Sequence, residues 1–266
     1  MAEQINKPDY FNITQIADSG QCFRFTKLDE NRYSAVYKEN YLEIEECGDK
    51  LIISCDSETW NKVWIKYFDL DTDYSKYADI LNNLGSGYDY IKGAFEYSKG
   101  IRILRQDSFE MLISYIISQR NRIPKISASV ERLSKAFGKE LKDKFTGKTF
   151  YSFPNEHELS TNIKDYTDIK LGYRDEYVAC AVSEVRKNGI GFYDTLDKAK
   201  SLYGVGDKVA NCYLLFGRHD ITRFPIDVWI QRILDREFDG CLSLNPFKEF
   251  AGVVQQYMFY FERNMS

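Results

Sequence analysis

The sequence has few of the residues from which protein metal sites are usually built. It contains two histidines, His157 and His219, and each stands alone, which excludes a site with several histidine ligands. The six cysteines include no Cys-x-x-C pair, and their spacing fits neither a zinc knuckle nor a cysteine-bound iron–sulfur cluster. We therefore expect no metal site and interpret the cysteines as reduced thiols in a core.

Long apolar runs and low-complexity segments are also missing. Five prolines and sixteen glycines are too few for a collagen-like chain. The longest apolar runs, such as residues 115–117 and 213–216, are far too short to cross a bilayer. The N-terminus has no basic region followed by an apolar stretch, so no signal peptide is visible. We expect a soluble intracellular protein of the cytoplasm or nucleoid, without a membrane partner.

What the sequence contains is an ordinary globular composition, with 44% hydrophobic and 29% charged residues. The first 55 residues are predicted to form strands, because residues 33–54 alternate with a period of two between turn signals. From residue 57 the apolar spacing lengthens to that of helices. The sequence thus predicts an α+β fold in three parts: an antiparallel β domain with a flanking helix at residues 1–85, a helical domain at 86–195, and residues 196–266 packed on that domain.

A buried helix is predicted to begin after residue 107. Asp107 and Glu110 have the spacing of a capping box, and the residues that follow are apolar nearly all round through Ile117. This helix ends in a polar and basic turn at residues 118–122.

A glycine turn between two short helices is the most informative segment. The pattern Leu-x-Gly-Val-Gly-x-Lys-Val-Ala at residues 202–210 is typical of a helix-hairpin-helix element, which grips a DNA backbone without reading its sequence. Gly204, Val205 and Gly206 form the turn between helices at 196–203 and 207–216, and the unpaired amides at the start of the second helix suit a phosphate. A glycine turn within a core is the alternative.

Lys208 lies in the first turn of that second helix. The helix dipole opposes a positive charge there and favours the neutral amine, which is a nucleophile that forms a Schiff base with a carbonyl-like carbon. An ordinary surface lysine is the alternative.

Asp227 follows nineteen residues later, directly after Phe-Pro-Ile at residues 224–226. It is placed to cap the next helix, and capping hydrogen bonds would keep its carboxylate ionised. A fixed carboxylate can stabilise positive charge that develops on a sugar ring, whereas a purely structural cap is the alternative.

The hairpin, the lysine and the Pro-x-Asp segment together resemble the helix-hairpin-helix DNA glycosylase superfamily, and within it the 8-oxoguanine DNA glycosylases. The resemblance extends over most of the chain. Four further segments carry it: Ser-Gly-Gln-Cys-Phe-Arg at 19–24, Leu-Arg-Gln-Asp at 104–107, Leu-Gly-Tyr-Arg at 171–174, and Ala-Gly at 251–252 with Gln255 and Phe259 after it.

The resemblance implies a bifunctional glycosylase and AP lyase that acts on a nucleotide flipped out of damaged double-stranded DNA. Lys208 would attack the anomeric carbon, Asp227 would assist departure of the base, and the resulting Schiff base would permit strand nicking by β-elimination. This chemistry needs no redox cofactor and no catalytic metal. A structural monovalent cation at the hairpin stays open, and we expect a monomer.

A base pocket is implied by the same resemblance. The Gly20 carbonyl would accept the N7–H that oxidised guanine has and guanine lacks, a difference of about 1–3 kcal/mol for a buried unmatched pair. Cys212 and Phe259 would sandwich the base, with Gln255 on its pairing edge. Helical spacing agrees, since Cys212 lies four residues after Lys208. Core packing is the alternative for Phe259.

DNA contacts must come from a local basic surface, because the net charge is −4. Tyr173 and Arg174 match family residues that wedge into the duplex and contact the orphaned base. A basic run at residues 120–125 would also face DNA, or else form a solvated turn. The expected contacts, besides the hairpin, are Arg120, Asn121, Lys125, Tyr173, Arg174 and Trp229.

Two other functions stay open on the sequence alone. A glycosylase for a different damaged base would keep Lys208 and Asp227 but not the Gly20 pocket. A non-catalytic helix-hairpin-helix module that only binds DNA would retain its function in a Lys208→Gln variant.

Three departures from the family pattern concern the opposite base. This chain has Arg120 where an asparagine is common, Lys125 where an arginine commonly reads the opposite cytosine, and Trp229 where a histidine is common. Because lysine lacks the planar fork of arginine, we predict a weaker preference for cytosine opposite the lesion. Comparable cleavage rates with each of the four opposite bases would support this prediction, and a steep preference for cytosine would contradict it.

Overall fold

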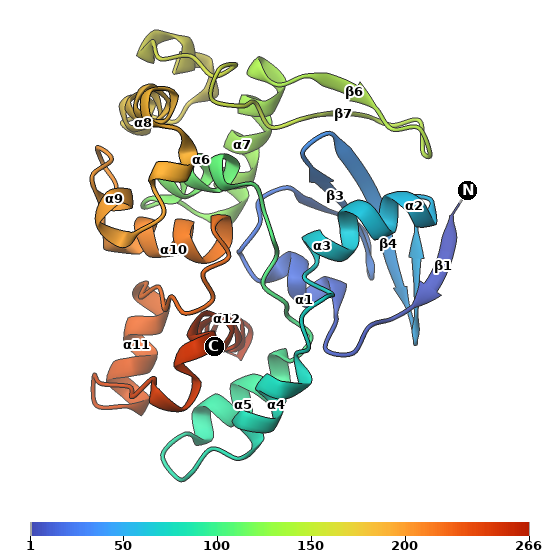
Figure 1. The fold of residues 1–266 in the computed structure, drawn as a ribbon, viewed down its shortest axis with the longest axis vertical. Coiled ribbons are helices and arrows are strands. Elements are labelled where there is room, and N and C mark those ends of the chain that lie inside the picture. The colour runs from blue at the N-terminus through green and yellow to red at the C-terminus, as the bar shows by residue number, and fades with distance from the viewer. Residues whose placement is uncertain (1, 266) are drawn as a thin grey trace.

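An antiparallel sheet of five strands forms the N-terminal part of the molecule. The computed structural model describes residues 2–265 and places this sheet on one side and most helices on the other (Figure 1). The strands are β1 (Glu3–Asn6), β2 (Phe25–Asp29), β3 (Arg32–Tyr37), β4 (Asn40–Cys47) and β5 (Lys50–Ile53). Their order is β1-β5-β4-β3-β2, and tight turns join β3, β4 and β5, which confirms the predicted meander.

One segment of the first 55 residues is a helix, so the prediction of strands there was wrong. Helix α1 (Ile13–Asp18) begins at Asn12, whose side chain accepts a hydrogen bond from the Gln15 N–H at 2.8 Å. Ile13 and Ile16 are buried in the same core as the sheet. The cap and the spacing of these two isoleucines therefore favour a helical turn over a strand.

The flanking helix of the sheet is made of three short pieces: α2 (Ser57–Thr59), the π-helix η1 (Trp60–Trp64) and α3 (Ile65–Tyr67). Trp64 and Tyr67 from this segment are buried among Ile44 and Ile53 of the sheet. Aromatic rings thus fill the core on this side of the molecule, as the helical spacing after residue 57 predicted.

The long central helix α6 (Ser108–Ser118) organises the helical body. Its N-cap Asp107 accepts hydrogen bonds from Phe109 and Glu110 N–H at 3.0 and 3.1 Å, which confirms the predicted cap. Every residue from Phe109 to Ser118 is buried. Packed directly against α6 are α7 (Ile123–Phe137), α8 (Arg174–Asn188) and α10 (Asp207–Gly217).

The remaining helices complete the body around the C-terminus. Helix α12 (Ala251–Met265) packs against α5 (Asp89–Ser98) and α11 (Val228–Glu237). Helix α4 (Ser75–Asn82) contacts α5 and the 3-10 helix η4 (Asn245–Phe250), where Tyr77 stacks on Phe250 with ring centroids 4.4 Å apart. The predicted domain boundaries stay a prediction. The other short elements are β6 (Glu140–Lys142), β7 (Thr149–Tyr151), η2 (Ile163–Ile169), η3 (Ile190–Phe192) and α9 (Leu196–Lys200).

The hairpin of β6 and β7 was not expected in a helical region, and it extends from α7 toward the N-terminal sheet (Figure 1). Phe150 of β7 lies 5.6 Å from the Tyr41 ring of β4, measured between centroids. Lys148 and Lys139 form ion pairs with Glu43 and Glu39. The hairpin therefore links the sheet to the helical body.

Close packing at Gly252 joins α12 to the chain that precedes α11. The Gly252 N–H donates to the Ile221 carbonyl at 2.8 Å, and a Cβ at this position would lie 2.8 Å from the Arg223 carbonyl oxygen. It would also lie 2.4 Å from Leu215 of α10. Only a glycine lets the helix approach this closely.

We predict that Gly252→Ala lowers the free energy of unfolding by about 2 kcal/mol, because the new methyl group must displace backbone. Urea denaturation would measure this change. Gly93→Ala in α5 is the matched control, since nothing lies within 4 Å of its Cβ position, and it should raise stability by up to about 1 kcal/mol through helix propensity. Equal effects of the two substitutions would contradict the packing argument.

Candidate active site

The glycine turn holds Lys208 at the start of α10. Gly204 has φ +79°, and a Cβ there would lie 2.5 Å from the Tyr177 ring, so this position requires glycine. The Val205 N–H donates to the Leu202 carbonyl at 3.0 Å, which closes the turn. Gly206 is the N-cap of α10, and Lys208 is exposed in its first turn, as predicted. The first hairpin helix, α9, is shorter than expected and ends at Lys200.

Asp227 caps α11 with one carboxylate oxygen. Its Oδ1 accepts hydrogen bonds from the Trp229 and Ile230 N–H groups at 3.0 and 2.9 Å, which confirms the predicted cap. Among residues 2–265, no hydrogen bond is donated to Oδ2. One oxygen therefore fixes the side chain while the other is free to face a substrate.

Lys208 and Asp227 line the same cavity, which has a volume of about 350 Å³. Its walls come from the turn before β2, from α6, α7, α10, α11 and α12, and from the turn that follows α6. Of the predicted site residues, those that line it are Gly20, Asn121, Lys208, Asp227, Trp229 and Phe259. Distant segments of the chain thus bring the predicted catalytic pair and two predicted pocket residues together.

An open groove of about 680 Å³ adjoins this cavity on the side of α11. Lys208, Asp227, Asn121 and Trp229 line both spaces, and Arg120 lines the groove. Ile226 and Val228, on either side of Asp227, are apolar yet 48% and 66% exposed here. Exposed apolar side chains beside a charged pair favour a surface that contacts a ligand.

Gly20 forms a wall of the cavity in the left-handed backbone region, with φ +78°. A Cβ at Gly20 would lie 3.4 Å from the Phe259 ring and 3.3 Å from Ile123, so a side chain would intrude on this wall. The Phe259 ring is half-buried and the Arg263 guanidinium lies 5.3 Å from its centroid.

Cys212 and Gln255 are buried and do not line the cavity. Burial raises the pKa of the Cys212 thiol to about 12, while the nearby Lys208 ammonium lowers it and the Asp227 carboxylate raises it. The thiol is therefore neutral and lies close enough to the catalytic pair to interact with both charges. Gln255 accepts a hydrogen bond from Gln256 Nε2 at 3.1 Å. Their contacts with a base stay a prediction.

Arg174 lies among the backbone of the turn after α6 rather than at the surface. It is 7% exposed, and its Nε donates to the Gln119 carbonyl at 2.9 Å while Nη1 donates to the Leu171 carbonyl at 3.0 Å. Its guanidinium also packs over the Tyr173 ring at 4.4 Å. The structure thus gives Arg174 a role in holding this turn, and its contact with DNA stays a prediction.

Tyr173 and Lys125 are exposed, as residues that face DNA must be. Neither lines the cavity or the groove, so their contacts with DNA also stay predictions. Arg120 is exposed as well and has φ +47°, a left-handed conformation that non-glycine residues rarely adopt. The predicted basic run therefore lies on a sharp turn whose backbone Arg174 supports.

Sequence reasoning missed Tyr115, a buried residue of α6 that lines the cavity. One feature of the sequence could have indicated it. Tyr115 carries a hydroxyl on a helix that is apolar nearly all round, and a buried tyrosine hydroxyl usually has a polar partner. The other cavity residues that were missed are Phe23, Ser118, Arg122, Ile123, Pro124, Ile126 and Arg263.

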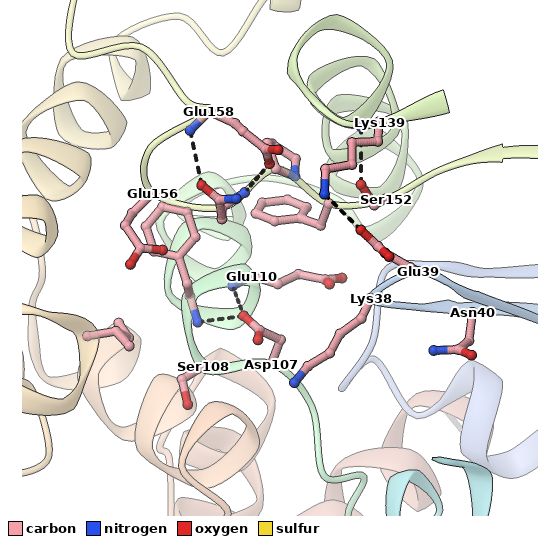
Figure 2. Close-up of a pocket in the computed structure, with 15 residues that line it drawn as sticks. Lys38, Glu39, Asn40, Asp107, Ser108, Glu110, Lys139, Ser152, Glu156 and Glu158 are labelled. Carbon is pink, nitrogen blue, oxygen red and sulfur yellow. Dashed lines mark hydrogen bonds and ion pairs between the residues drawn. The ribbon is translucent and has the colours of Figure 1, made fainter. Parts of the chain in front are cut away.

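Another cavity, of about 580 Å³, lies at the opposite end of α6, and neither Lys208 nor Asp227 lines it (Figure 2). Figure 2 shows the Glu110 side chain in this cavity, near Lys38 of the β3–β4 turn. Burial raises the pKa of Glu110 to about 7, while Arg24 lowers it and Asp107 raises it. Within residues 2–265 no cluster of three or more metal-ligating side chains is present, nor any helix long and apolar enough to cross a membrane.

A lysine that follows a glycine hairpin and an aspartate that caps the next helix, both at one cavity, are typical of the class of helix-hairpin-helix DNA glycosylases. Residues 4–112 match the family described as 8-oxoguanine DNA glycosylase, N-terminal domain. The chain is 27% identical to an N-glycosylase/DNA lyase of Saccharomyces cerevisiae over 291 residues, covering 92% of this chain and 73% of the yeast protein.

Two solved structures match almost the whole chain. The structure of MBOgg1 in complex with a low affinity DNA ligand is 32% identical, with a TM-score of 0.88 over 99% of this chain and 96% of that one. The Clostridium acetobutylicum 8-oxoguanine glycosylase/lyase, in complex with DNA containing cytosine opposite 8-oxoG, is 31% identical. Its TM-score is 0.86 over 100% of this chain and 98% of that one. The chain belongs to the 8-oxoguanine DNA glycosylase/lyase family.

The raised pKa of Glu110 leads to a pH-dependent stability. Between about pH 4.5 and pH 7 the folded protein holds a proton on this carboxyl that the unfolded chain releases, so stability falls as the pH rises through this range and the loss is complete above about pH 7. We predict that Glu110→Gln is more stable than the unsubstituted protein by about 3 kcal/mol at about pH 8, and by less than about 1 kcal/mol at about pH 5.

Urea unfolding at the two pH values measures this difference. Glu156→Gln, a half-buried carboxylate on the same cavity wall, is the control and should show no such pH dependence. A stability gain from Glu110→Gln of equal size at both pH values would contradict the assignment.

Proposed function

We propose that this protein is a bifunctional DNA glycosylase and AP lyase that excises 8-oxoguanine from double-stranded DNA in base excision repair. The observation that carries the proposal is the shared cavity of Lys208, Asp227 and Gly20, in a chain whose family and fold are those of 8-oxoguanine glycosylase/lyases. A glycosidic bond inside a stacked duplex is out of reach, so the target nucleotide must be flipped into this cavity.

Base removal begins when Lys208 gives up its proton and the resulting amine attacks the anomeric carbon of the flipped nucleotide. The bond from this carbon to the base breaks, and its electron pair leaves with the base. Positive charge develops on the sugar during this step, and the Asp227 carboxylate, held by its cap to α11, stabilises it.

Strand cleavage follows from the covalent bond to the lysine. Opening of the sugar ring gives a Schiff base between Lys208 and the former anomeric carbon. This iminium withdraws electrons, a proton leaves the neighbouring carbon, and the 3′ phosphate departs by β-elimination. Water then hydrolyses the Schiff base and restores the free lysine.

Recognition of the base uses the pocket that the family resemblance implies. The Gly20 carbonyl accepts the N7–H of 8-oxoguanine, and the base lies between Phe259 and the neutral Cys212 thiol. Gln255 reads the pairing edge of the base. These roles are part of the proposal, and the position of Gly20 and Phe259 on the cavity wall supports the roles of those two residues.

DNA contacts come from the hairpin amides at residues 204–206 and from the groove beside α11. Arg120, Asn121 and Trp229 line the groove or the cavity, so the duplex backbone is placed across the C-terminal end of α6. A binding module without chemistry would have no use for Lys208 and Asp227 on one cavity wall, which disfavours that alternative.

In this proposal the protein acts as a monomer on DNA inside the cell. The reaction uses neither a redox cofactor nor a catalytic metal. A structural monovalent cation at the hairpin fits the backbone there. The Tyr203 and Val205 carbonyls accept no backbone hydrogen bond from the described residues, and such oxygens are suitable ligands for a monovalent cation.

Borohydride trapping on a duplex with one 8-oxoguanine tests the chemistry. Borohydride reduces a Schiff base to a stable amine, so we predict a covalent protein–DNA adduct with the unsubstituted protein and none with Lys208→Gln. A duplex without the lesion is the control for substrate. Released base without an adduct would instead indicate a water-using glycosylase, and neither adduct nor release would contradict the proposed substrate.

A further inference from the structure

Tyr115, from the middle of the buried helix α6, lines the cavity together with Gly20. The residue is 4% exposed, and its ring is stacked on Phe216 with centroids 5.4 Å apart and planes 15° apart. Phe23 contacts the ring edge-on at 5.6 Å. These two rings fix the direction of the Tyr115 side chain, so its hydroxyl is held in the cavity wall.

The hydroxyl lies beside the Gly20 carbonyl, with 3.5 Å between the two oxygens. Within residues 2–265 this is the one hydrogen bond that the carbonyl accepts. It is longer than the usual 2.7–2.8 Å of an O–H···O bond, so both groups can take a better partner. Two residues of the cavity wall therefore offer an acceptor and a donor side by side.

This pair complements the edge of an oxidised guanine. Such a base carries a donor, N7–H, next to an acceptor, the oxygen on C8. Unmodified guanine has a lone pair on N7 and a hydrogen on C8, and that hydrogen cannot accept a bond from a hydroxyl. Building on the proposed function, we propose that Tyr115 is a specificity-determining residue whose hydroxyl donates to the C8 oxygen while the Gly20 carbonyl accepts from N7–H.

The hydroxyl is available as a donor at all physiological pH values. Burial raises the pKa of Tyr115 well above its ordinary value, and the nearby Cys212 and Cys22 thiols raise it further. Because the same burial excludes water from this wall, a base that leaves the hydroxyl unpaired is disfavoured.

Tyr115→Phe removes the oxygen and keeps the ring contacts with Phe216 and Phe23. We expect the single-turnover rate of 8-oxoguanine excision to fall about tenfold, the usual effect of one lost hydrogen bond. The rate of β-elimination at a preformed abasic site should be unchanged, because that substrate has no base to read. Tyr213→Phe is the matched control: Tyr213 is also buried, its hydroxyl has no partner, and it does not line the cavity.

A second modified base distinguishes two roles of the Tyr115 hydroxyl. The hydroxyl could donate to the C8 oxygen of the base, or it could only hold the Gly20 carbonyl in place. 8-Thioguanine keeps N7–H but replaces the oxygen on C8 with sulfur, a weaker acceptor. The unsubstituted protein should excise the oxo base faster than the thio base, and Tyr115→Phe should reduce that preference by the same tenfold factor.

Three outcomes would overturn the proposal. They are an excision rate in Tyr115→Phe equal to that of the unsubstituted protein, an equal loss in excision and in β-elimination, and an unchanged preference between the oxo and thio bases. Failure of the proposed function is distinct from these, because the unsubstituted protein itself would then excise no 8-oxoguanine.

Discussion

The cap that Asp227 forms on α11 is the interaction on which the geometry of the site depends. A helix N-cap contributes about 1 kcal/mol to stability, which is small for a protein of this size. Its larger effect is to fix the Asp227 side chain, because both N–H bonds go to Oδ1, which leaves Oδ2 without a donor in a residue that lines the same cavity as Lys208. The chain before the cap is held in turn by α12, through the close contact at Gly252.

The cavity wall that Gly20 forms is fixed by a separate set of bonds near the other end of the chain. Gln21, directly after Gly20, is buried, and its side chain donates to the Arg102 carbonyl at 2.9 Å and accepts from the Leu104 N–H at 2.8 Å. These hydrogen bonds hold the turn before β2 against residues 102–104, which precede α6 in the chain. The wall that Gly20 forms thus rests on buried polar contacts, which cost more to break than exposed ones, whereas the bonds of the Asp227 cap are partly buried.

Sequence patterns predicted the features that depend on neighbouring residues: the strand meander, the cap at Asp107, the glycine hairpin and the cap at Asp227. They failed for α1, where a short helix lies among strands, and for the hairpin of β6 and β7. The burial of Arg174 and the contact of the Tyr115 hydroxyl with the Gly20 carbonyl depend on segments that are distant in the sequence. No local pattern encodes such contacts, so only the folded structure shows them.

Identifying the residue that bonds to the sugar tests the central claim most directly. The unsubstituted protein would be reduced with borohydride on a duplex that contains 8-oxoguanine, the DNA digested with nuclease, and the peptides analysed by mass spectrometry. The account predicts that the deoxyribose remnant is attached to the peptide that contains Lys208. A remnant on another lysine or on the amino terminus would contradict it, because the cavity would then not be the reaction site.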